Sequence, residues 1–328
     1  MKRKLLSSDW LPADVIDFLK EDFDITYPEK EIYGSYSEED ISRLIPDFDV
    51  LLLGGQRVAK GAIDRATKLR AICRSGAGCD GVDYIYAGSK GIAVINTPHA
   101  VTHPTAELTI GLMLDTARNI SNMDRRMRQE KCCCDCPSFI NTTAGLYGKT
   151  LGIIGFGRIG KAVAGKAAGL GMQILYSDVI SAPKEAEEAV GARKVSLDEL
   201  LRTSDFVTLH CPFVPENLHL INAERLAMMK PTAFLINASR GKMVNEADLA
   251  AALKNKTIRG AGLDVYEFEP EVNAELFAMD NVVLSPHAGT WVYEARAAMI
   301  KETMAGACIF LKGETPPNLF NGEYLVTK

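Results

Sequence analysis

The chain has 328 residues, of which 47% are hydrophobic and 24% are charged, and its formal net charge is −5. This length and composition predict about two globular domains. The negative charge argues against a nucleic-acid partner, because phosphate neutralisation needs clustered Lys and Arg. The sequence contains no apolar run of about 18 residues and no signal-peptide core, so we expect no membrane contact and a cytoplasmic location.

The eight cysteines do not resemble a disulfide framework, and they fit a reducing compartment. Four of them form the unusual run Cys132-Cys133-Cys134-Asp135-Cys136. Adjacent thiols on an extended strand point to opposite sides, so they cannot all converge on one tetrahedral metal. We therefore expect no metal and prefer an exposed, oxidation-prone loop, although the role of the run stays open.

Short apolar segments alternate with amphipathic ones in the N-terminal third of the chain. Strands are predicted at residues 4–7, 24–27, 50–53, 70–73 and 93–95, with helices between them, for example at 12–21. This alternation predicts an α/β protein with a doubly wound parallel sheet. One long helix is expected from about residue 105 to 128, because its apolar positions keep a helical period.

A second α/β unit begins after a connection at residues 141–148. Its strands are predicted at residues 151–154, 206–209, 233–237, 260–264 and 282–285. Helices are expected to start at Ser196, where Glu199 completes a capping-box pattern, and at Asn245, and a final helix spans residues 290–311. We expect the second unit to be a dinucleotide domain inserted into a smaller outer domain, with substrate bound in the cleft between them.

The motif Gly155-x-Gly157-x-x-Gly160 directly follows the apolar run at residues 151–154. Gly155 allows a tight turn, Gly157 lets the backbone approach a pyrophosphate, and Gly160 lets the following helix pack closely on the strand. The strand, turn and helix in this order predict dinucleotide binding.

Charge around this loop indicates which dinucleotide is bound. The backbone N–H groups of Arg158 and Ile159 would lie at a helix N-terminus, where they attract phosphate oxygens. Asp178 ends the next apolar strand, at the place expected for a carboxylate that binds both ribose hydroxyls. Because that carboxylate would repel a 2′-phosphate, the sequence favours NAD over NADP.

Three chemically active side chains each follow a predicted strand of this second unit: Arg240, a glutamate before Pro270, and His287. Arginine can grip a carboxylate with two parallel donors, and histidine can exchange a proton near neutral pH. Glu267 and Glu269 are both candidates for the acid, and each of these side chains could alternatively be only a loop charge or a structural group. Together they match 2-oxo acid reduction, in which a hydride reaches the carbonyl carbon, a proton reaches its oxygen and the carboxylate is held.

In this order, the motifs resemble the D-isomer-specific 2-hydroxyacid dehydrogenase family over nearly the whole chain. The resemblance rests on Ser75-Gly76-Ala77-Gly78-Cys79-Asp80, Asn96-Thr97-Pro98, Ala106-Glu107, Gly148 to Gly160, His210-Cys211-Pro212, Met229-Lys230-Pro231, Asn237 to Gly241 and Asp264 to Pro270. It implies two doubly wound parallel-sheet domains. A Rossmann NAD-binding domain at residues 102–289 would be inserted into a flavodoxin-like substrate-binding domain at 1–101 and 290–328.

The resemblance also implies roles for individual residues. Arg240 would orient the substrate carboxylate and carbonyl, and His287 would be the general acid/base, paired with Glu269. A nearby carboxylate favours the protonated imidazole, which suits proton donation. Asp264 would be a supporting acid near the nicotinamide.

Binding of cofactor, substrate and partner follows from the same resemblance. The backbone of Ser75, Gly76, Ala77 and Gly78 would bind the substrate carboxylate; His210, Cys211 and Pro212 would line the adenosine side; Ala238 and Arg240 would flank the nicotinamide ribose. Family members usually form homodimers through the region matching residues 105–148, which would place the cysteine run in that dimerisation arm.

Three features depart from the family pattern: the cysteine run, the histidines at the hinge, and a tryptophan near the catalytic histidine. His99 and His103 could add polar groups to the pocket or serve only the hinge, and Trp291 could enclose the substrate side chain or merely pack on its helix.

Sequence alone leaves the acid and the physiological direction open. A small or medium unphosphorylated 2-oxo acid is preferred, because Arg57 and Arg74 make no dense basic patch for a phosphate. The alternatives are a D-3-phosphoglycerate dehydrogenase and, in another class, an NAD-sensing corepressor-like binding protein.

Overall fold

The computed structural model describes residues 2–29, 35–131 and 142–326. The chain forms two compact units, one made of Met1–Val101 and Thr290–Lys328 and the other of Thr102–Gly289. All strand pairs of both units are parallel, which confirms the predicted α/β fold class. The cysteine run at residues 132–136 lies outside the described residues.

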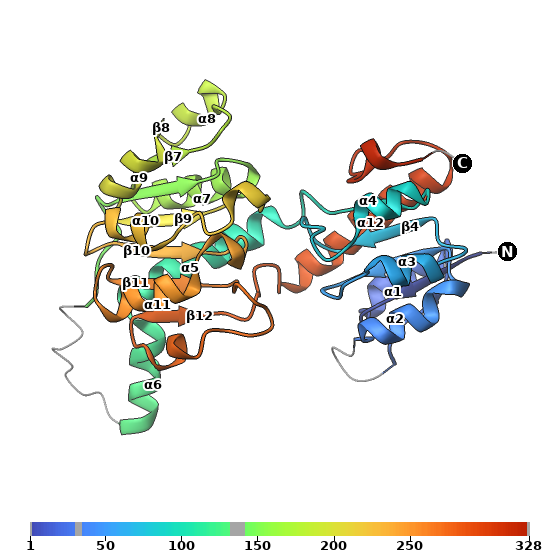
Figure 1. Ribbon diagram of the computed structural model, residues 1–328, viewed down its shortest axis with the longest axis horizontal. Coiled ribbons are helices and arrows are strands. Elements are labelled where there is room, and N and C mark those ends of the chain that lie inside the picture. The colour runs from blue at the N-terminus through green and yellow to red at the C-terminus, as the bar shows by residue number, and fades with distance from the viewer. Residues whose placement is uncertain (1, 30–34, 132–141, 327–328) are drawn as a thin grey trace. The chain divides into compact units, whose positions relative to one another are not determined.

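The first unit contains a five-stranded sheet in the order β2-β1-β3-β4-β5, which is the flavodoxin-like order. Its strand β4 and its helices are labelled in Figure 1. Its strands are β1 (Arg3–Ser7), β2 (Phe23–Thr26), β3 (Val50–Leu53), β4 (Ala71–Arg74) and β5 (Ala93–Ile95). Its helices are α1 (Ala13–Lys20), α2 (Glu38–Leu44), α3 (Lys60–Arg65), α4 (Tyr84–Ser89) and α12 (Tyr293–Leu311). All four residues of β3 are buried, because helices cover both faces of the sheet.

The second unit contains a seven-stranded sheet in the order β12-β11-β10-β9-β6-β7-β8. Its strands are β6 (Thr150–Ile154), β7 (Gln173–Ser177), β8 (Ala192–Lys194), β9 (Phe206–Leu209), β10 (Phe234–Asn237), β11 (Gly260–Leu263) and β12 (Val282–Leu284). Its helices are α5 (Thr102–Arg118), α6 (Ile120–Glu130), α7 (Arg158–Gly169), α8 (Lys184–Glu188), α9 (Leu197–Thr203), α10 (Ala223–Met228) and α11 (Glu246–Lys254). This is the Rossmann strand order with one strand added at an edge, and the order reverses between β6 and β9.

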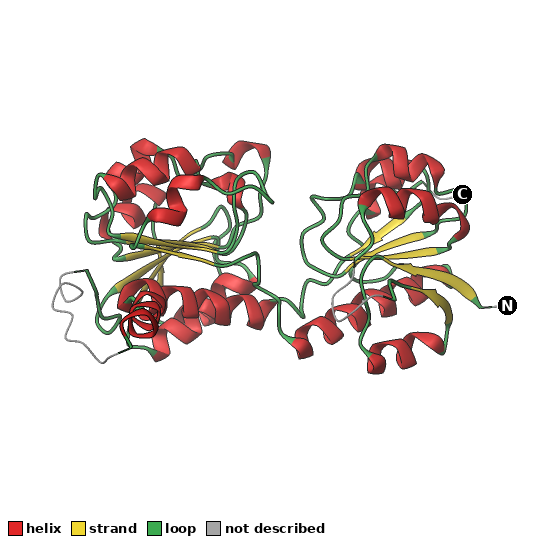
Figure 2. Cartoon of the chain, turned by 90° about the horizontal axis from the view of Figure 1, so that it is seen from below, coloured by secondary structure: helices red, strands yellow, loops and turns green. Residues whose placement is uncertain are grey.

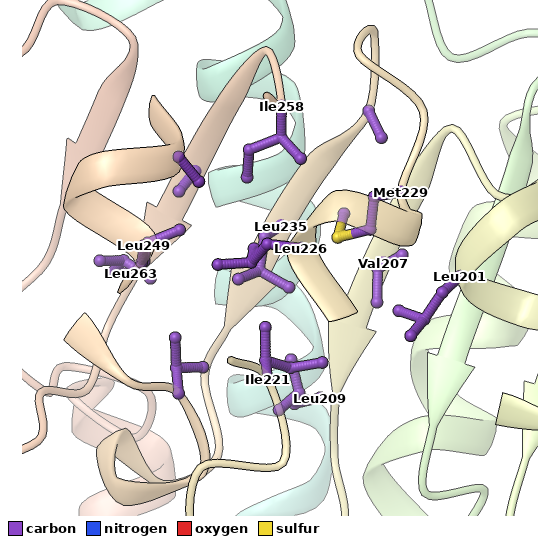
Figure 3. Packing of buried hydrophobic residues seen from close by; sticks show 14 of the residues in the cluster. Leu201, Val207, Leu209, Ile221, Leu226, Met229, Leu235, Leu249, Ile258 and Leu263 are labelled. Carbon is purple, nitrogen blue, oxygen red and sulfur yellow. The ribbon is translucent and has the colours of Figure 1, made fainter. Parts of the chain in front are cut away.

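Helices lie on both faces of the second sheet, and an apolar core fills each side (Figure 2). On one side, the inward residues of β9, β10 and β11 pack against α10 and α11 (Figure 3). Among them Val207, Leu235 and Leu249 are fully buried. Burial on both faces explains why these strands are mostly apolar in the sequence.

The single long helix expected at residues 105–128 is wrong, because Asn119 separates α5 from α6. The backbone of Asn119 is left-handed, with φ of 55°, and its side chain donates to the Thr142 hydroxyl at 3.1 Å. Asparagine tolerates this conformation better than most residues. The apolar period continues across the break, so it could not reveal the turn.

Other boundaries differ by a few residues. The last helix begins at Tyr293 rather than at residue 290, because the Thr290 carbonyl already accepts from the Val292 N–H in a turn. Ser196 caps α9 as predicted. The Glu199 carboxylate does not complete the expected capping box and instead contacts Arg193 at 3.1 Å. No helix within the described part of the chain is sufficiently long and apolar to cross a membrane.

Candidate active site

The glycine loop after β6 is shaped by two close backbone contacts. Gly155 has φ of 92°, and a Cβ there would lie 2.3 Å from the Cys211 nitrogen. A Cβ on Gly160 would lie 2.2 Å from the Gly155 carbonyl oxygen. Neither position can hold a larger residue unless the backbone moves, so both glycines are needed for the turn into α7.

Gly157 and the start of α7 provide an open surface for an anion. A Cβ on Gly157 would meet no atom within 4 Å, and no side chain caps the helix that Gly157 precedes. The first N–H groups of α7, including those of Arg158 and Ile159, have no intrahelical acceptor. This cradle fits a dinucleotide pyrophosphate, with the positive end of the helix dipole directed at it.

Asp178 is held beside the glycine loop. One of its carboxylate oxygens accepts from the Phe156 N–H at 2.7 Å, and the other accepts from the Ile180 N–H at 3.0 Å. The Phe156 ring also stacks on Tyr176, with centroids 4.2 Å apart. The carboxylate is half-buried and keeps free lone pairs, so it can also accept from ribose hydroxyls.

His210 and Cys211 follow β9, next to the same loop. Burial lowers the pKa of His210 to about 3, so its ring is neutral. Its Nε2 lies 3.0 Å from the Thr208 hydroxyl, while its buried Nδ1 has no partner among the described residues. Burial raises the pKa of the Cys211 thiol to about 11, so the sulfur is not a thiolate at neutral pH.

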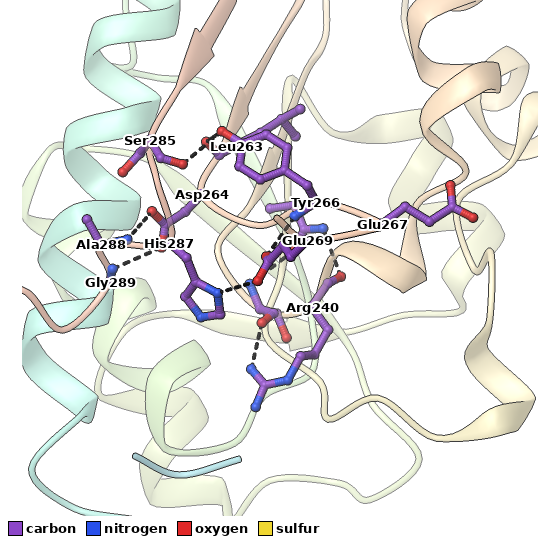
Figure 4. Close-up of polar contacts among 12 residues, drawn as sticks. Arg240, Leu263, Asp264, Tyr266, Glu267, Glu269, Ser285, His287, Ala288 and Gly289 are labelled. Carbon is purple, nitrogen blue, oxygen red and sulfur yellow. Dashed lines mark hydrogen bonds and ion pairs between the residues drawn. The ribbon is translucent and has the colours of Figure 1, made fainter. Parts of the chain in front are cut away.

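The adjacent parallel strands β10, β11 and β12 end at one edge of the sheet, and their loops carry Arg240, Glu269 and His287 (Figure 4). His287 Nδ1 lies 2.9 Å from a Glu269 carboxylate oxygen. The backbone of His287 is left-handed, with φ of 57°, and 51% of its side chain is exposed. With Nδ1 engaged by Glu269, the exposed Nε2 is the atom that can exchange a proton with a ligand.

Glu269 is suited to remain ionised. Partial burial alone would raise its pKa, but the hydrogen bond and charge of His287 outweigh this and hold the pKa below its usual range. The Tyr266 N–H, which donates to the other Glu269 oxygen at 3.0 Å, and the charge of Arg240 act in the same direction.

Arg240 lies at the start of a short 3-10 helix (η4, Gly241–Met243). One guanidinium nitrogen donates to the Ser239 carbonyl at 2.8 Å, and the Asn237 amide donates to the Arg240 carbonyl at 3.0 Å. A Cβ on Gly241 would lie 1.9 Å from the Tyr266 carbonyl carbon, so the arginine loop packs directly on the loop that carries Glu269.

Asp264 and Tyr266 support the histidine loop. Asp264 is 1% exposed, and its two oxygens accept from the N–H groups of Ala288 at 2.7 Å and Gly289 at 2.9 Å. The buried Tyr266 hydroxyl donates to the Ser285 carbonyl at 2.8 Å. The carboxylate of Asp264 thus braces the loop that carries His287, and its predicted contact with the nicotinamide remains a prediction.

In the first unit, the segment from Ser75 to Gly78 follows β4. The N–H groups of Ser75 and Gly76 donate to the carbonyls of Leu53 at 3.0 Å and Arg74 at 2.9 Å. Among the described residues no group accepts from the Ala77 or Gly78 N–H. If this segment binds a carboxylate, these two amides are therefore the better candidates.

The remaining predicted positions are less informative. Ala238 is buried directly after β10, and Pro212 is exposed. His99 and His103 are exposed, and Trp291 is 69% exposed before α12, so ordinary packing on that helix does not account for it. Within the described ranges, no His, Cys, Asp and Glu side chains cluster as metal ligands.

Comparisons with known proteins show the family to which the chain belongs. Residues 110–289 match the model of the D-isomer specific 2-hydroxyacid dehydrogenase, NAD binding domain. Glyoxylate reductases of Thermococcus onnurineus and Pyrococcus furiosus are 40% and 39% identical to the chain, cover 99% of it, and are themselves covered to 98% and 97%.

Solved structures point the same way. A glyoxylate reductase from Paecilomyes thermophila is 29% identical, with a TM-score of 0.81 and coverage of 96% of this chain and 97% of that one. The holo form of Rhodotorula graminis D-mandelate dehydrogenase is also 29% identical, with a TM-score of 0.81 and 97% of each chain covered. The chain belongs to the D-isomer specific 2-hydroxyacid dehydrogenase family and is an NAD(H)-dependent oxidoreductase acting between 2-hydroxy and 2-oxo acids.

Proposed function

We propose that this enzyme reduces small unphosphorylated 2-oxo acids of the glyoxylate type, with Arg240 as the carboxylate-binding group and His287 as the proton donor. The observation that carries the proposal is the 2.9 Å contact between His287 and Glu269, at the sheet edge that also carries Arg240. A permanent cation, a proton donor and an orienting acid are the groups that this reduction needs.

The residues would divide the work as follows. When bound, NADH supplies the hydride that reduces the carbonyl carbon. Arg240 binds the substrate carboxylate through parallel N–H donors and fixes the carbonyl. The protonated His287 donates from Nε2 to the developing alkoxide, while its Nδ1–H stays on Glu269. The neutral ring then regains a proton from solvent, which its exposure permits. Oxidation of the 2-hydroxy acid runs through the same groups in reverse.

The glycine loop, the N-terminus of α7 and Asp178 would hold the cofactor. The open space at Gly157 and the uncapped helix support the pyrophosphate position. The carboxylate of Asp178 supports a preference for NADH, because a 2′-phosphate would bring like charge against it.

The substrate class is supported by the relatives and by the basic residues of the first unit. The relatives at about 40% identity are named glyoxylate reductases. Arg74 donates to the Ser75 carbonyl at 3.0 Å, and Arg57 is exposed, so they give little support for a phosphate subsite and the phosphoglycerate alternative is the weaker one.

We also propose that the first unit binds substrate through residues 75–78, and that the enzyme is a cytoplasmic homodimer using residues 105–148. Support for the dimer comes from α6, where Ile120 is 52% and Met127 is 54% exposed. The two residues are seven positions apart and therefore lie on the same face of the helix, where a partner would cover them. Sedimentation at several protein concentrations would test this.

The decisive experiment is a screen of NADH oxidation with glyoxylate, hydroxypyruvate, pyruvate, and branched and aromatic 2-oxo acids. 3-Phosphoglycerate is tested with NAD in the oxidative direction. We expect the highest kcat/KM with glyoxylate or hydroxypyruvate. A preference for 3-phosphoglycerate, or no turnover with any of these acids, would overturn the proposed substrate class.

A further inference from the structure

A second histidine–glutamate pair lies in the same unit as the site. His219 Nε2 lies 2.6 Å from a Glu267 carboxylate oxygen. Glu267 comes two residues before Glu269, and in Figure 4 its side chain points away from Glu269 and His287. The proposed chemistry does not use this pair.

Glu267 joins the loop after β11 to the start of α11. Its second oxygen accepts from the Glu246 N–H at 3.1 Å, and its own N–H donates to a Glu246 oxygen at 2.7 Å. The other Glu246 oxygen accepts from the Asn273 N–H at 3.0 Å. Both glutamates are buried, so their oxygens need hydrogen-bond donors, which these N–H groups and the imidazole of His219 supply.

The backbone of His219 is attached to the loop that carries Arg240. Its N–H donates to the Lys242 carbonyl at 2.9 Å, and the Ile221 N–H donates to the Met243 carbonyl at 2.8 Å. Lys242 and Met243 belong to η4, which follows Arg240 directly. One residue therefore contacts the arginine loop through its backbone and the glutamate loop through its side chain.

The two loops also contact each other at Gly241, where a Cβ would overlap the Tyr266 carbonyl. A small shift of one loop must therefore move the other. His219 has a left-handed backbone, with φ of 51°, which turns its ring back toward Glu267.

We propose that His219 is a positioning residue that, through Glu267, sets the relative placement of Arg240 and Glu269. This inference rests on the proposed roles of Arg240, Glu269 and His287. Removing the imidazole leaves a buried Glu267 oxygen without its donor, and the carboxylate must then move or take up water. The loop would carry Glu269 away from His287 and shift Arg240 relative to the substrate carboxylate.

The test is a double-mutant cycle with His219→Asn, Glu267→Gln and the double variant. Asparagine tolerates a left-handed backbone but is too short to replace the imidazole at Glu267. We expect kcat/KM for glyoxylate to fall by about 10- to 100-fold in His219→Asn, because misplacement by about 1 Å has effects of this size.

Three readouts separate positioning from loss of folding. The KM for glyoxylate should rise, and the dissociation constant for NADH should stay unchanged. The fall of activity at low pH should move to higher pH, because Glu269 loses part of the contact with His287 that holds its pKa below its usual range. In the Glu267→Gln background, His219→Asn should have little additional effect. Glu224→Gln, on the exposed side of α10, is the matched control and should behave as the unmodified enzyme.

The inference is overturned if His219→Asn keeps kcat/KM and KM within about twofold. It is also overturned if the only change is a lower thermal midpoint, with KM and pH profile intact below that midpoint, or if the two substitutions act additively. Arg240→Lys and His287→Asn are assayed in parallel. If those two variants retain activity, the proposed function fails; if they lose activity and His219→Asn does not, only this inference fails.

Discussion

Two histidine–glutamate pairs meet the loop after β11, and they differ in exposure. In the pair His287–Glu269 the side chains are 51% and 36% exposed, whereas in His219–Glu267 they are 35% and 10% exposed. Both histidines have left-handed backbones. The same contact therefore appears once where a ligand can reach it and once where the carboxylate is buried and joins two loops.

The difference shows that environment, rather than residue type, separates the two assignments. The exposed pair has an accessible ring nitrogen and a glutamate whose pKa is held below its usual range despite partial burial. In the pair His219–Glu267, the carboxylate accepts from the Glu246 N–H at the start of α11 as well as from His219. We assign proton exchange to the first pair and positioning to the second.

The largest effect is expected for His287→Asn, which removes the proton donor. Turnover with glyoxylate should fall by about 10²- to 10⁴-fold, the usual range for loss of a general acid. NADH binding, measured by fluorescence titration, should be nearly unchanged. Turnover close to that of the unmodified enzyme would remove His287 from its role and end the distinction between the two pairs.

A smaller loss is expected for Arg240→Lys, because an ammonium cannot provide the two parallel donors of guanidinium. Losing one charge-assisted hydrogen bond should lower kcat/KM by roughly 10- to 100-fold. Most of the change should be a higher KM for the 2-oxo acid. Arg202→Lys, on the exposed surface of α9, is the matched control, and equal losses in both variants would argue against carboxylate binding by Arg240.

The pH dependence of activity in Glu269→Gln tests whether Glu269 acts on His287. Partial burial would raise the pKa of Glu269, but the contact with His287 holds it below its usual range, so the carboxylate stays ionised to a lower pH than an ordinary glutamate. As the pH falls through that lowered pKa the carboxylate is protonated and its contact with His287 weakens, so activity should fall on the acid side. Glu269→Gln, which has no titrating carboxylate at this position, should lack that fall. We expect roughly a tenfold loss of kcat/KM at neutral pH. An unchanged profile would show that Glu269 does not act on His287.

The smallest effect is expected for Asp178→Ala. Losing hydrogen bonds to the ribose of about 1 kcal/mol should raise the KM for NADH about fivefold. Activity with NADPH should rise at the same time, because the like charge is gone. If the unmodified enzyme already prefers NADPH, the interpretation of Asp178 is wrong.

Much of the fold was predictable because the sequence of a buried parallel strand is a mostly apolar run. β3 and β9 begin and end where those runs do. The break at Asn119 was not predictable, since the apolar period passes through it and the turn depends on a contact with Thr142. The short strand β8 was missed because it has no buried residues and thus no apolar signal.

In the site, Arg240, Glu269 and His287 could be grouped because neighbouring parallel strands end at one edge of a sheet. Residue spacing left Glu267 and Glu269 as alternatives, and the family resemblance pointed to Glu269, which lies 2.9 Å from His287. His219 was missed because 48 residues separate it from Glu267 and no periodic pattern connects them. The bracing of Ala288 by Asp264 was missed for the same reason, as it joins a side chain to a distant backbone amide.

The central claim is that the exposed pair and Arg240 converge on the reacting carbonyl. It is tested most directly by a crystal structure with NADH and oxamate, an unreactive analogue of a 2-oxo acid. We predict His287 Nε2 at about 2.6–3.2 Å from the carbonyl oxygen of oxamate, with two Arg240 nitrogens on the ligand. An imidazole turned away from the ligand, or a carboxylate bound without Arg240, would contradict the account.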